Sequence, residues 1–285
     1  MSTDGQLNPS AELTTTVIRP TKGWAPARLG DILRSRELLY FLVWSELKVR
    51  YKQTVLGVGW AVIRPLAIMA VFTIFFGMVV RVPTGGIPYP IFAYSGLVVW
   101  QYFSTAMSQS SNSLVQYEPL ITKVYFPRLL VPMASVISGL VDFLIAFAVL
   151  VVLVNVYGFA PTAAIWTLPL FMLLAAAIAL AVSLWLSALN VQYRDVRLLV
   201  PVLVQLWFFS TPIIYPSGLV PERWSTLYEI INPMVNVVEG FRWALLGDVA
   251  APGPTLIFSI LTILVVLVSG MYYFRRMERI FADVV

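Results

Sequence analysis

Few side chains in this sequence could do chemistry, and those that could are mainly basic or aromatic. The chain has no histidine and no cysteine, which removes Ser-His and Cys-His nucleophiles, disulfides and the usual zinc ligands. It also lacks the GxxxxGK[ST] loop that cradles nucleotide phosphates. We therefore expect no catalytic residue and no metal site, and any energy must come from a partner or an ion gradient.

The charged residues near apolar stretches are the main exceptions. Asp142 lies near the middle of a long apolar run, where a carboxylate is costly and suggests a functional pathway. The alternative is a structural role, in which Asp142 is neutral or bonded to Ser138 or to a group on another helix. Arg64 lies near one end of a different apolar stretch. There its side chain can snorkel toward the membrane surface, or its guanidinium can bind a phosphate through two parallel hydrogen bonds.

Six long apolar stretches must position these side chains. Hydrophobic residues make up 59% of the chain and charged residues 12%, and a bilayer needs about 20 apolar residues per helix. The sequence therefore predicts an all-α membrane protein with six transmembrane helices. The predicted spans cover residues 60–80, 90–112, 129–157, 164–189, 198–215 and 254–274.

Positive charge is concentrated on one side of these spans. The basic residues that flank span ends on that side are Lys48, Arg50, Lys52, Lys123, Arg128, Arg194, Arg197, Arg275, Arg276 and Arg279. The opposite side has only Arg81, Arg223 and Arg242. Because basic loops stay in the cytoplasm, both termini are expected there. The net charge of +5 is mostly explained by these basic residues on the cytoplasmic side. We therefore expect no nucleic-acid partner.

The N-terminal region divides into two parts. Residues 1–34 are mostly polar and are expected to form a disordered cytoplasmic arm rather than a cleavable signal peptide. Residues 35–56 combine helically spaced aromatics with basic residues and are too charged to span. They predict a helix lying in the cytoplasmic interface, either as a simple anchor or as a surface that meets an anionic lipid headgroup.

Two connections outside the spans have helix signals. Residues 116–128 place Glu118 and Pro119 in the first turn of a short inner helix, which is either a partner contact or an ordinary turn. Residues 216–253 contain two helix starts, at Pro221 and at Asn232-Pro233, the second helix ending near Gly247. Two half-membrane helices that return to the outer face fit this segment, as an outer gate or a structural cap.

Two further sets of side chains complete the candidates. Glu239 and Arg242, three residues apart in the second outer helix, are expected to pair across a turn. Aromatic residues are concentrated in the first and fifth spans and could form a track for sugar rings, although lipid-facing or packing roles are alternatives. These candidate channel aromatics are Phe72, Phe75, Phe76, Trp207, Phe208 and Tyr215.

Four runs resemble one family, the integral permeases of ABC exporters for bacterial polysaccharides such as O-antigen, capsule and teichoic acid. They are LKVRYKQTVLGVGWAVIRPL at 47–66, ALNVQYRDVR at 188–197, STPIIYPSGLVPERW at 210–224 and NPMVNVVEGFRWALLG at 232–247. The resemblance covers residues 35–285, and the first run is most similar to the O-antigen branch.

The resemblance implies a homodimer in the bacterial inner membrane that binds two copies of a separate ATPase subunit, which holds ATP and Mg²⁺. It implies a cargo of polysaccharide linked to undecaprenyl pyrophosphate, and no enzyme activity in this chain. It also implies a 35–56 interface helix, a coupling helix at 117–127, gate helices at 219–228 and 233–246, and a channel lined by the first and fifth spans.

Several residues receive roles from this resemblance together with the patterns above. Arg50, Lys52 and Arg64 are candidates to meet the lipid pyrophosphate at the inner interface. Candidates for contact with the ATPase are Glu118, Pro119, Lys123 and Tyr125, and candidates for the outer gate are Trp224, Glu239, Arg242 and Trp243.

Three alternatives remain open at the level of sequence. A related permease that exports drugs or lipids would share the topology without a long glycan channel. A membrane glycan polymerase would need catalytic carboxylates, for which Asp142 alone is weak support. An ion-driven carrier would need several intramembrane charges.

Overall fold

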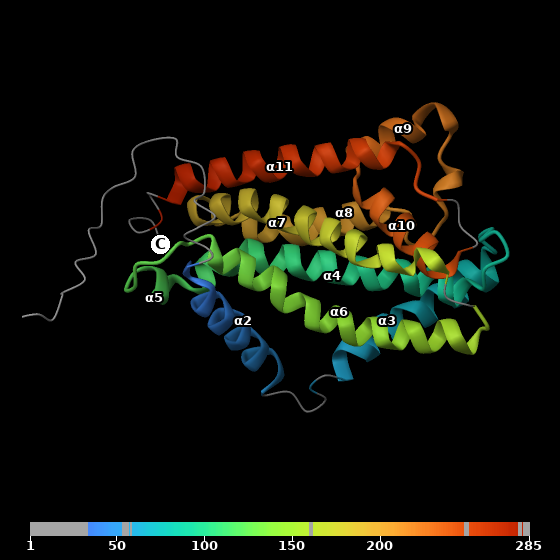
Figure 1. The fold of residues 1–285 in the computed structure, drawn as a ribbon, viewed down its shortest axis with the longest axis horizontal. Helices are drawn as coiled ribbons and strands as arrows, with labels where there is room; N and C mark the ends of the chain where they lie inside the picture. The colour runs from blue at the N-terminus through green and yellow to red at the C-terminus, as the bar shows by residue number, and fades with distance from the viewer. Residues whose placement is uncertain are drawn as a thin grey trace, which may run out of the picture.

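The described part of the chain is a bundle of helices. The computed structural model describes residues 34–52, 57, 59–159, 162–247, 251–278 and 281, and within these ranges it contains helices and no strand. The predicted polar arm therefore lies outside the described residues, except for Arg34. Most of the long helices run along the long axis of the molecule (Figure 1).

The bundle is built around α4 (Tyr89–Gln116), which packs against α6 (Leu130–Val156) and α7 (Leu168–Gln192). On α4, residues 91–100 are all buried. The helices α3 (Gly59–Phe72), α8 (Val196–Phe209) and α11 (Thr255–Glu278) complete the long elements. A π-helical segment, η1 (Thr73–Val79), continues α3, and a 3₁₀ segment, η2 (Ala163–Thr167), precedes α7.

Four helical segments are long and apolar enough to cross a membrane. They are Gly59–Val79, Leu130–Val156, Ala163–Gln192 and Thr255–Glu278, which match the first, third, fourth and sixth predicted spans. The segment α4 has 28 residues but carries more polar side chains, and α8 has only 14. The predicted fifth span at 198–215 is too long, because the helix ends at Phe209 and the chain turns around Pro212, which has no N–H to continue it.

Two of these helices are unusual for how little of their surface is buried. Only Pro65 is buried on α3 and only Val200 on α8. Each helix also contains one internal proline, Pro65 and Pro201 respectively. Each helix packs one face partly against the core and leaves apolar side chains on its other face exposed, among them Ile63 and Val71 on α3 and Leu198, Val202 and Leu206 on α8.

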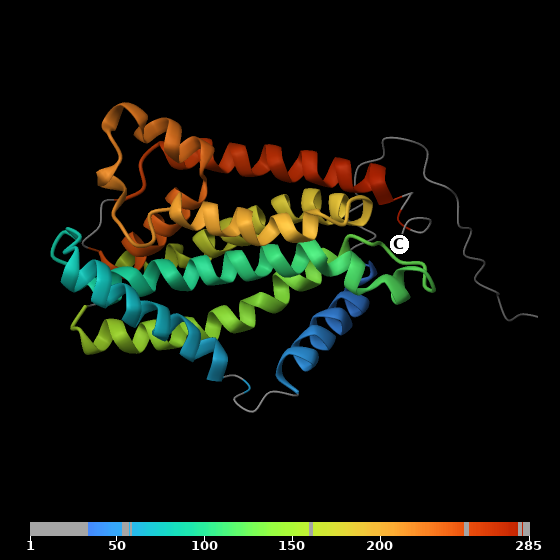
Figure 2. The ribbon, with the colours of Figure 1, turned by 180° about the vertical axis from the view of Figure 1, so that it is seen from behind.

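The helix α2 (Arg36–Tyr51) crosses α6 obliquely at one end of the bundle (Figures 1 and 2). Leu42 is its one buried residue, and Tyr40, Phe41 and Trp44 are exposed. A helix was predicted over 35–56; the structure ends it at Tyr51, and residues 53–56 lie outside the described part of the chain.

Two short helices lie at opposite ends of the bundle. A single turn, α5 (Glu118–Ile121), lies at the end where α11 finishes, and α9 (Glu222–Ile231) lies at the other end (Figure 1). The predicted coupling helix over 117–127 is thus much shorter than expected, although Pro119 does lie in its first turn. Residues after Ile121 form turns and bends.

The two helices predicted in the 216–253 segment are present. Pro221 precedes α9, and α10 (Met234–Leu246) follows Asn232, whose side-chain oxygen accepts a hydrogen bond from the Met234 N–H at 3.2 Å. Gly247 ends α10 with φ of 73°, a left-handed conformation that favours glycine. The residues of α10 are largely buried, whereas none of α9 is.

Candidate functional site

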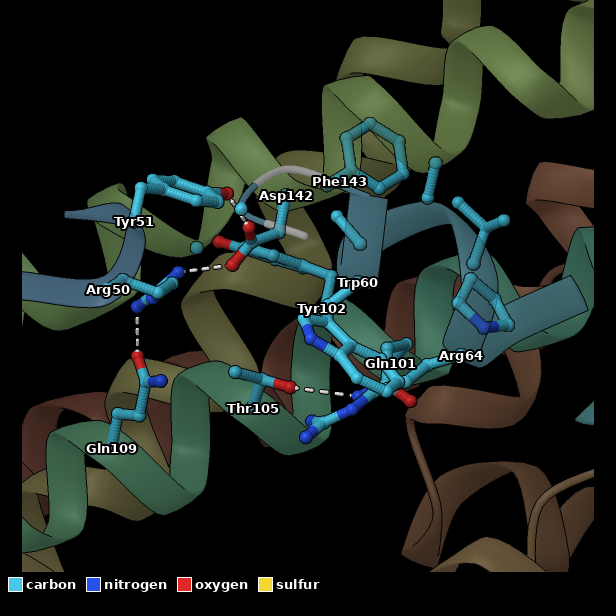
Figure 3. Close-up of a pocket in the computed structure, with 16 residues that line it drawn as sticks. Arg50, Tyr51, Trp60, Arg64, Gln101, Tyr102, Thr105, Gln109, Asp142 and Phe143 are labelled. Atoms are coloured by element: carbon cyan, nitrogen blue, oxygen red, sulfur yellow. Dashed lines mark hydrogen bonds and ion pairs between the residues drawn. The ribbon is translucent and has the colours of Figure 1, made fainter. Parts of the chain in front are cut away.

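A cavity of about 250 Å³ lies where the C-terminal end of α2, the start of α3, and the middles of α4 and α6 meet. Figure 3 shows Arg50 and Tyr51 on one side of it and Trp60 and Arg64 on the other. Gln101, Thr105 and Gln109 of α4, with Asp142 and Phe143 of α6, line the walls between them.

An ion pair joins α2 to α6 in the wall of this cavity. The Arg50 guanidinium binds the Asp142 carboxylate, and both side chains are mostly buried, with 20% and 26% of their surface exposed. Arg50 also donates to Gln109, and to the Ser138 hydroxyl at 3.3 Å. Of the alternatives for Asp142, the structure therefore shows a bond to a group on another helix.

Tyr51 donates the second hydrogen bond to Asp142. Burial, together with the neighbouring Asp142 carboxylate, raises the pKa of Tyr51 above its ordinary value. Its hydroxyl therefore keeps its proton at neutral pH and acts as a donor. The carboxylate is held by one cation and one neutral hydroxyl, both from the end of α2.

A second polar contact fastens the middle of α2 to α6. The Ser135 and Ser138 hydroxyls each donate to the Glu46 carboxylate at 2.6 Å. Sequence reasoning did not assign Glu46 or Gln109. The available signal was the pair of serines three residues apart on α6, which lie on one helical face and can meet the same partner.

The three basic residues predicted at the inner interface have different environments. Arg50 is already occupied by Asp142, whereas Arg64 and Lys52 are exposed. Arg64 lines the cavity, and its guanidinium carbon lies 5.9 Å from the centre of the Trp60 ring. Lys52 does not line the cavity. Arg64 is therefore the exposed cation that faces this space.

A larger groove, of about 600 Å³, lies between α3, α4 and α8. Phe72 and Phe208 stack across it with ring centres 5.9 Å apart and an interplanar angle of 27°. Trp100 of α4 packs edge-on against Phe208 at 5.6 Å, and Gln101 borders both the groove and the smaller cavity. Trp100 was missed because it lies on a buried helix among other apolar residues.

The other four candidate channel aromatics do not line this groove. Trp207 donates to Asn232 at 2.8 Å and packs on Phe103 of α4, so it faces the interior. Tyr215 donates to the Phe209 carbonyl at 2.9 Å, and its hydroxyl lies 3.5 Å from that of Tyr228 on α9. Phe76 packs edge-on against Phe72, and Phe75 is exposed.

The four residues predicted for partner contact share one exposed surface. Glu118, Pro119, Lys123 and Tyr125 are all exposed, and Tyr125 reaches 82%. Buried Ile121 and Phe126 anchor the segment in an apolar cluster that also contains Leu42, Phe274 and Phe281. The segment is thus a surface feature attached to both α2 and the end of α11.

The predicted pair between Glu239 and Arg242 is not formed. Arg242 is 1% exposed and donates to three backbone carbonyls, those of Phe92, Pro212 and Ile213. Its guanidinium carbon also lies 3.8 Å from the centre of the Phe92 ring. Glu239 instead accepts from the Ser217 N–H at 3.3 Å.

Arg242 therefore joins α10 to α4 and to the turn after α8, because those carbonyls lie closer to its guanidinium than Glu239 does. The remaining outer candidates differ in exposure. Trp243 is half-buried against the core, whereas Trp224 on α9 is 51% exposed.

A helical bundle with several segments able to cross a bilayer, and with charged groups at its ends and cavity walls, defines a multi-pass membrane protein. Residues 37–246 match the family model for the ABC-2 type transporter. The chain therefore belongs to the ABC-2 type transporter membrane family.

Curated relatives are similar over most of the chain. An O-antigen export system permease protein RfbA from Myxococcus xanthus is 32% identical over 253 residues, covering 87% of this chain and 96% of the relative. An RfbA from Klebsiella pneumoniae is 31% identical, covering 87% and 95%. The polysialic acid transport protein KpsM from Escherichia coli is 25% identical, covering 82% and 90%.

Proposed function

We propose that this chain is the transmembrane permease subunit of an ABC transporter that exports polysaccharide, of the O-antigen type, across the bacterial inner membrane. The observation that carries the proposal is the similarity to relatives named as O-antigen export permeases over 87% of the chain. The groove with Phe72, Trp100 and Phe208 supports it, because flat aromatic faces suit the apolar CH surfaces of sugar rings.

The proposed topology has six spans with both termini in the cytoplasm. In addition to the four long apolar segments, α4 and α8 would complete the set. The support is the distribution of charge in the fold: α5, the turn between α7 and α8, and the basic end of α11 lie at one end of the bundle (Figure 1). Basic residues gathered at one end mark the cytoplasmic side.

At this cytoplasmic end, two copies of a separate ATPase subunit would bind, holding ATP and Mg²⁺. The exposed surface at Glu118, Pro119, Lys123 and Tyr125 is the proposed contact. Its support is physical. Tyr125 is largely exposed, and buried Ile121 anchors its segment in the apolar cluster shared with α2 and α11, so a displacement of this surface by a partner would move those helices.

The chain would act as a homodimer whose two copies enclose the polysaccharide. The outward-facing α3 and α8 support this proposal, because two apolar helices bordering one groove leave a surface that a second copy could cover. At the opposite end, α9 and α10 would act as the outer gate. The buried contacts of Arg242 hold α10, whereas exposed α9 is freer to move.

The cargo would carry an undecaprenyl pyrophosphate group that meets Arg64 and Lys52 at the inner interface. Arg64 is suited to this role because it is exposed at a cavity and its planar guanidinium can bind phosphate with two parallel hydrogen bonds. Arg50 could contribute only by leaving Asp142, because its guanidinium is already engaged.

Deletion of the gene tests this function. We expect the polysaccharide to be synthesised but trapped in the cytoplasm on its lipid carrier, and rescue to require both this chain and the ATPase subunit. Loss of synthesis itself would point to a polymerase. Normal surface polysaccharide would refute the proposal and favour export of another cargo.

A further inference from the structure

A stripe of polar side chains faces the smaller cavity from α4. From Ile91 to Ser111 of this helix, every residue is buried except Gln101, Thr105, Ser108 and Gln109. Gln101, Thr105 and Gln109 are spaced by four residues, share one face, and all line the cavity. Over residues 91–111, α4 therefore exposes only hydrogen-bonding side chains, and three of these four line the cavity.

These groups have unused hydrogen-bonding capacity. Gln101 donates to the Thr105 hydroxyl at 3.1 Å, and Gln109 accepts from Arg50. Among the residues that the structure describes, no partner is recorded for the Gln101 carbonyl oxygen or for the Gln109 NH₂ group. Side-chain amides and hydroxyls can both donate and accept, which matches the hydroxyl and amide groups of a sugar.

The remaining walls suit the same kind of ligand. Trp60 and Tyr102 supply aromatic surface, and Arg64 supplies positive charge at one side (Figure 3). Small-molecule sites usually measure about 300–1,000 Å³, so a cavity of about 250 Å³ takes one small unit rather than a stretch of polymer. The only acidic side chain lining it, among the described residues, is Asp142, which Arg50 and Tyr51 already hold.

We propose that this cavity is a binding site for a single sugar residue, the one next to the pyrophosphate of a lipid-linked glycan, and that Gln101 and Thr105 recognise its hydroxyl or amide groups. The inference rests on the proposed function, because it takes the lipid-linked glycan as cargo. It goes beyond a site for the charged headgroup, because it assigns recognition of the sugar to uncharged residues on α4.

The position of Gln101 determines how the ligand would be oriented in this site. It borders both the cavity and the aromatic groove between α3, α4 and α8. A sugar bound at Gln101 and Thr105 therefore lies beside the entrance to the groove, with the charged end of the ligand toward Arg64. The chain that follows the first sugar would continue past Trp100 and Phe208.

The test measures binding of two lipids by the full-length protein, in complex with its ATPase subunit in nanodiscs. The probes are undecaprenyl pyrophosphate and undecaprenyl pyrophosphate carrying one N-acetylglucosamine. We expect the wild-type complex to bind the sugar-bearing lipid about three- to tenfold more tightly, as one to two added hydrogen bonds would give. In Gln101→Leu combined with Thr105→Val, this ratio should fall to about one.

Gln116→Leu is the matched control, because it makes the same chemical change on the exposed end of α4, outside the cavity. It should keep the wild-type ratio. Size-exclusion elution and thermal unfolding of each variant report whether it is folded, and Thr105→Ser, which retains the hydroxyl, should preserve most of the preference.

Three results would overturn the inference: equal affinity of the wild-type complex for both lipids, an unchanged ratio in the double variant, or no binding of either lipid. Each leaves the gene-deletion result untouched, so export could still be the function. Normal surface polysaccharide after deletion would refute the function independently of these affinities.

Discussion

Arg242→Ala should destabilise the folded protein strongly. The guanidinium donates at 2.6 Å to Pro212 O, 2.7 Å to Ile213 O and 3.1 Å to Phe92 O. Hydrogen bonds of charged groups contribute about 1.5–3 kcal/mol each in soluble proteins, whereas those within membranes average about 0.6 kcal/mol. Taking about 1 kcal/mol for each bond, the substitution should lower the free energy of unfolding by about 3 kcal/mol.

Two further variants act on the same contacts. Arg242→Lys keeps the charge but loses the planar fork that reaches several carbonyls, so its loss of stability should be intermediate. Gly96→Ala would place a Cβ 2.6 Å from Arg242 Nη2. Because three carbonyls hold that guanidinium, we expect it to yield poorly and Gly96→Ala to destabilise as well.

Thermal unfolding of purified protein in detergent, followed by fluorescence of its nine tryptophans, measures these changes. Arg223→Ala is the control, since Arg223 is exposed on α9 and surface substitutions usually change stability by less than about 0.5 kcal/mol. If Arg242→Ala unfolds at the same temperature as Arg223→Ala, the three bonds do not stabilise the fold and the reasoning is wrong.

Three other substitutions test separate parts of the structure. Gly240→Ala would place a Cβ 2.0 Å from the buried Phe171 ring, so thermal unfolding should show a loss of about 1–3 kcal/mol; wild-type stability would contradict this packing. Asp142→Asn and Arg50→Gln, measured singly and together, should show a coupling free energy of about 1–2 kcal/mol, between exposed and buried ion pairs; additive effects would show that the pair contributes nothing. Arg64→Ala should reduce export while leaving dimer and ATPase assembly intact, as measured by surface polysaccharide and co-purification, and unchanged export would remove Arg64 from the headgroup site.

The sequence predicted helix ends correctly where a single glycine or proline determines the backbone conformation. Gly247 marked the end of α10 because left-handed φ favours glycine, and Pro119 marked the first turn of α5 because a missing N–H is harmless there. The length of α5 was overestimated because Ile121 and Phe126 are buried as anchors rather than as one face of a longer helix.

Long-range partners could not be predicted in the same way. Asp142 was recognisable as a costly residue in need of a partner, but Arg50 lies 92 residues away and only the crossing of α2 over α6 brings them together. The error at Arg242 has the opposite cause. Spacing along the helix suggested Glu239, whereas tertiary packing supplied three carbonyls from elsewhere in the chain.

The internal prolines of α3 and α8 determine where these helices can bend. A proline within a helix lacks the N–H that would bond four residues back, so Pro65 and Pro201 remove the helical donors to the Ala61 and Arg197 carbonyls. Pro65 and Ala61 line the smaller cavity, and Pro201 lines the groove. Since kinks form at such positions, both helices can bend more easily beside the space that they border. The cavity and the groove could therefore change size by bending of α3 and α8 at these prolines, while α4 stays in place behind them.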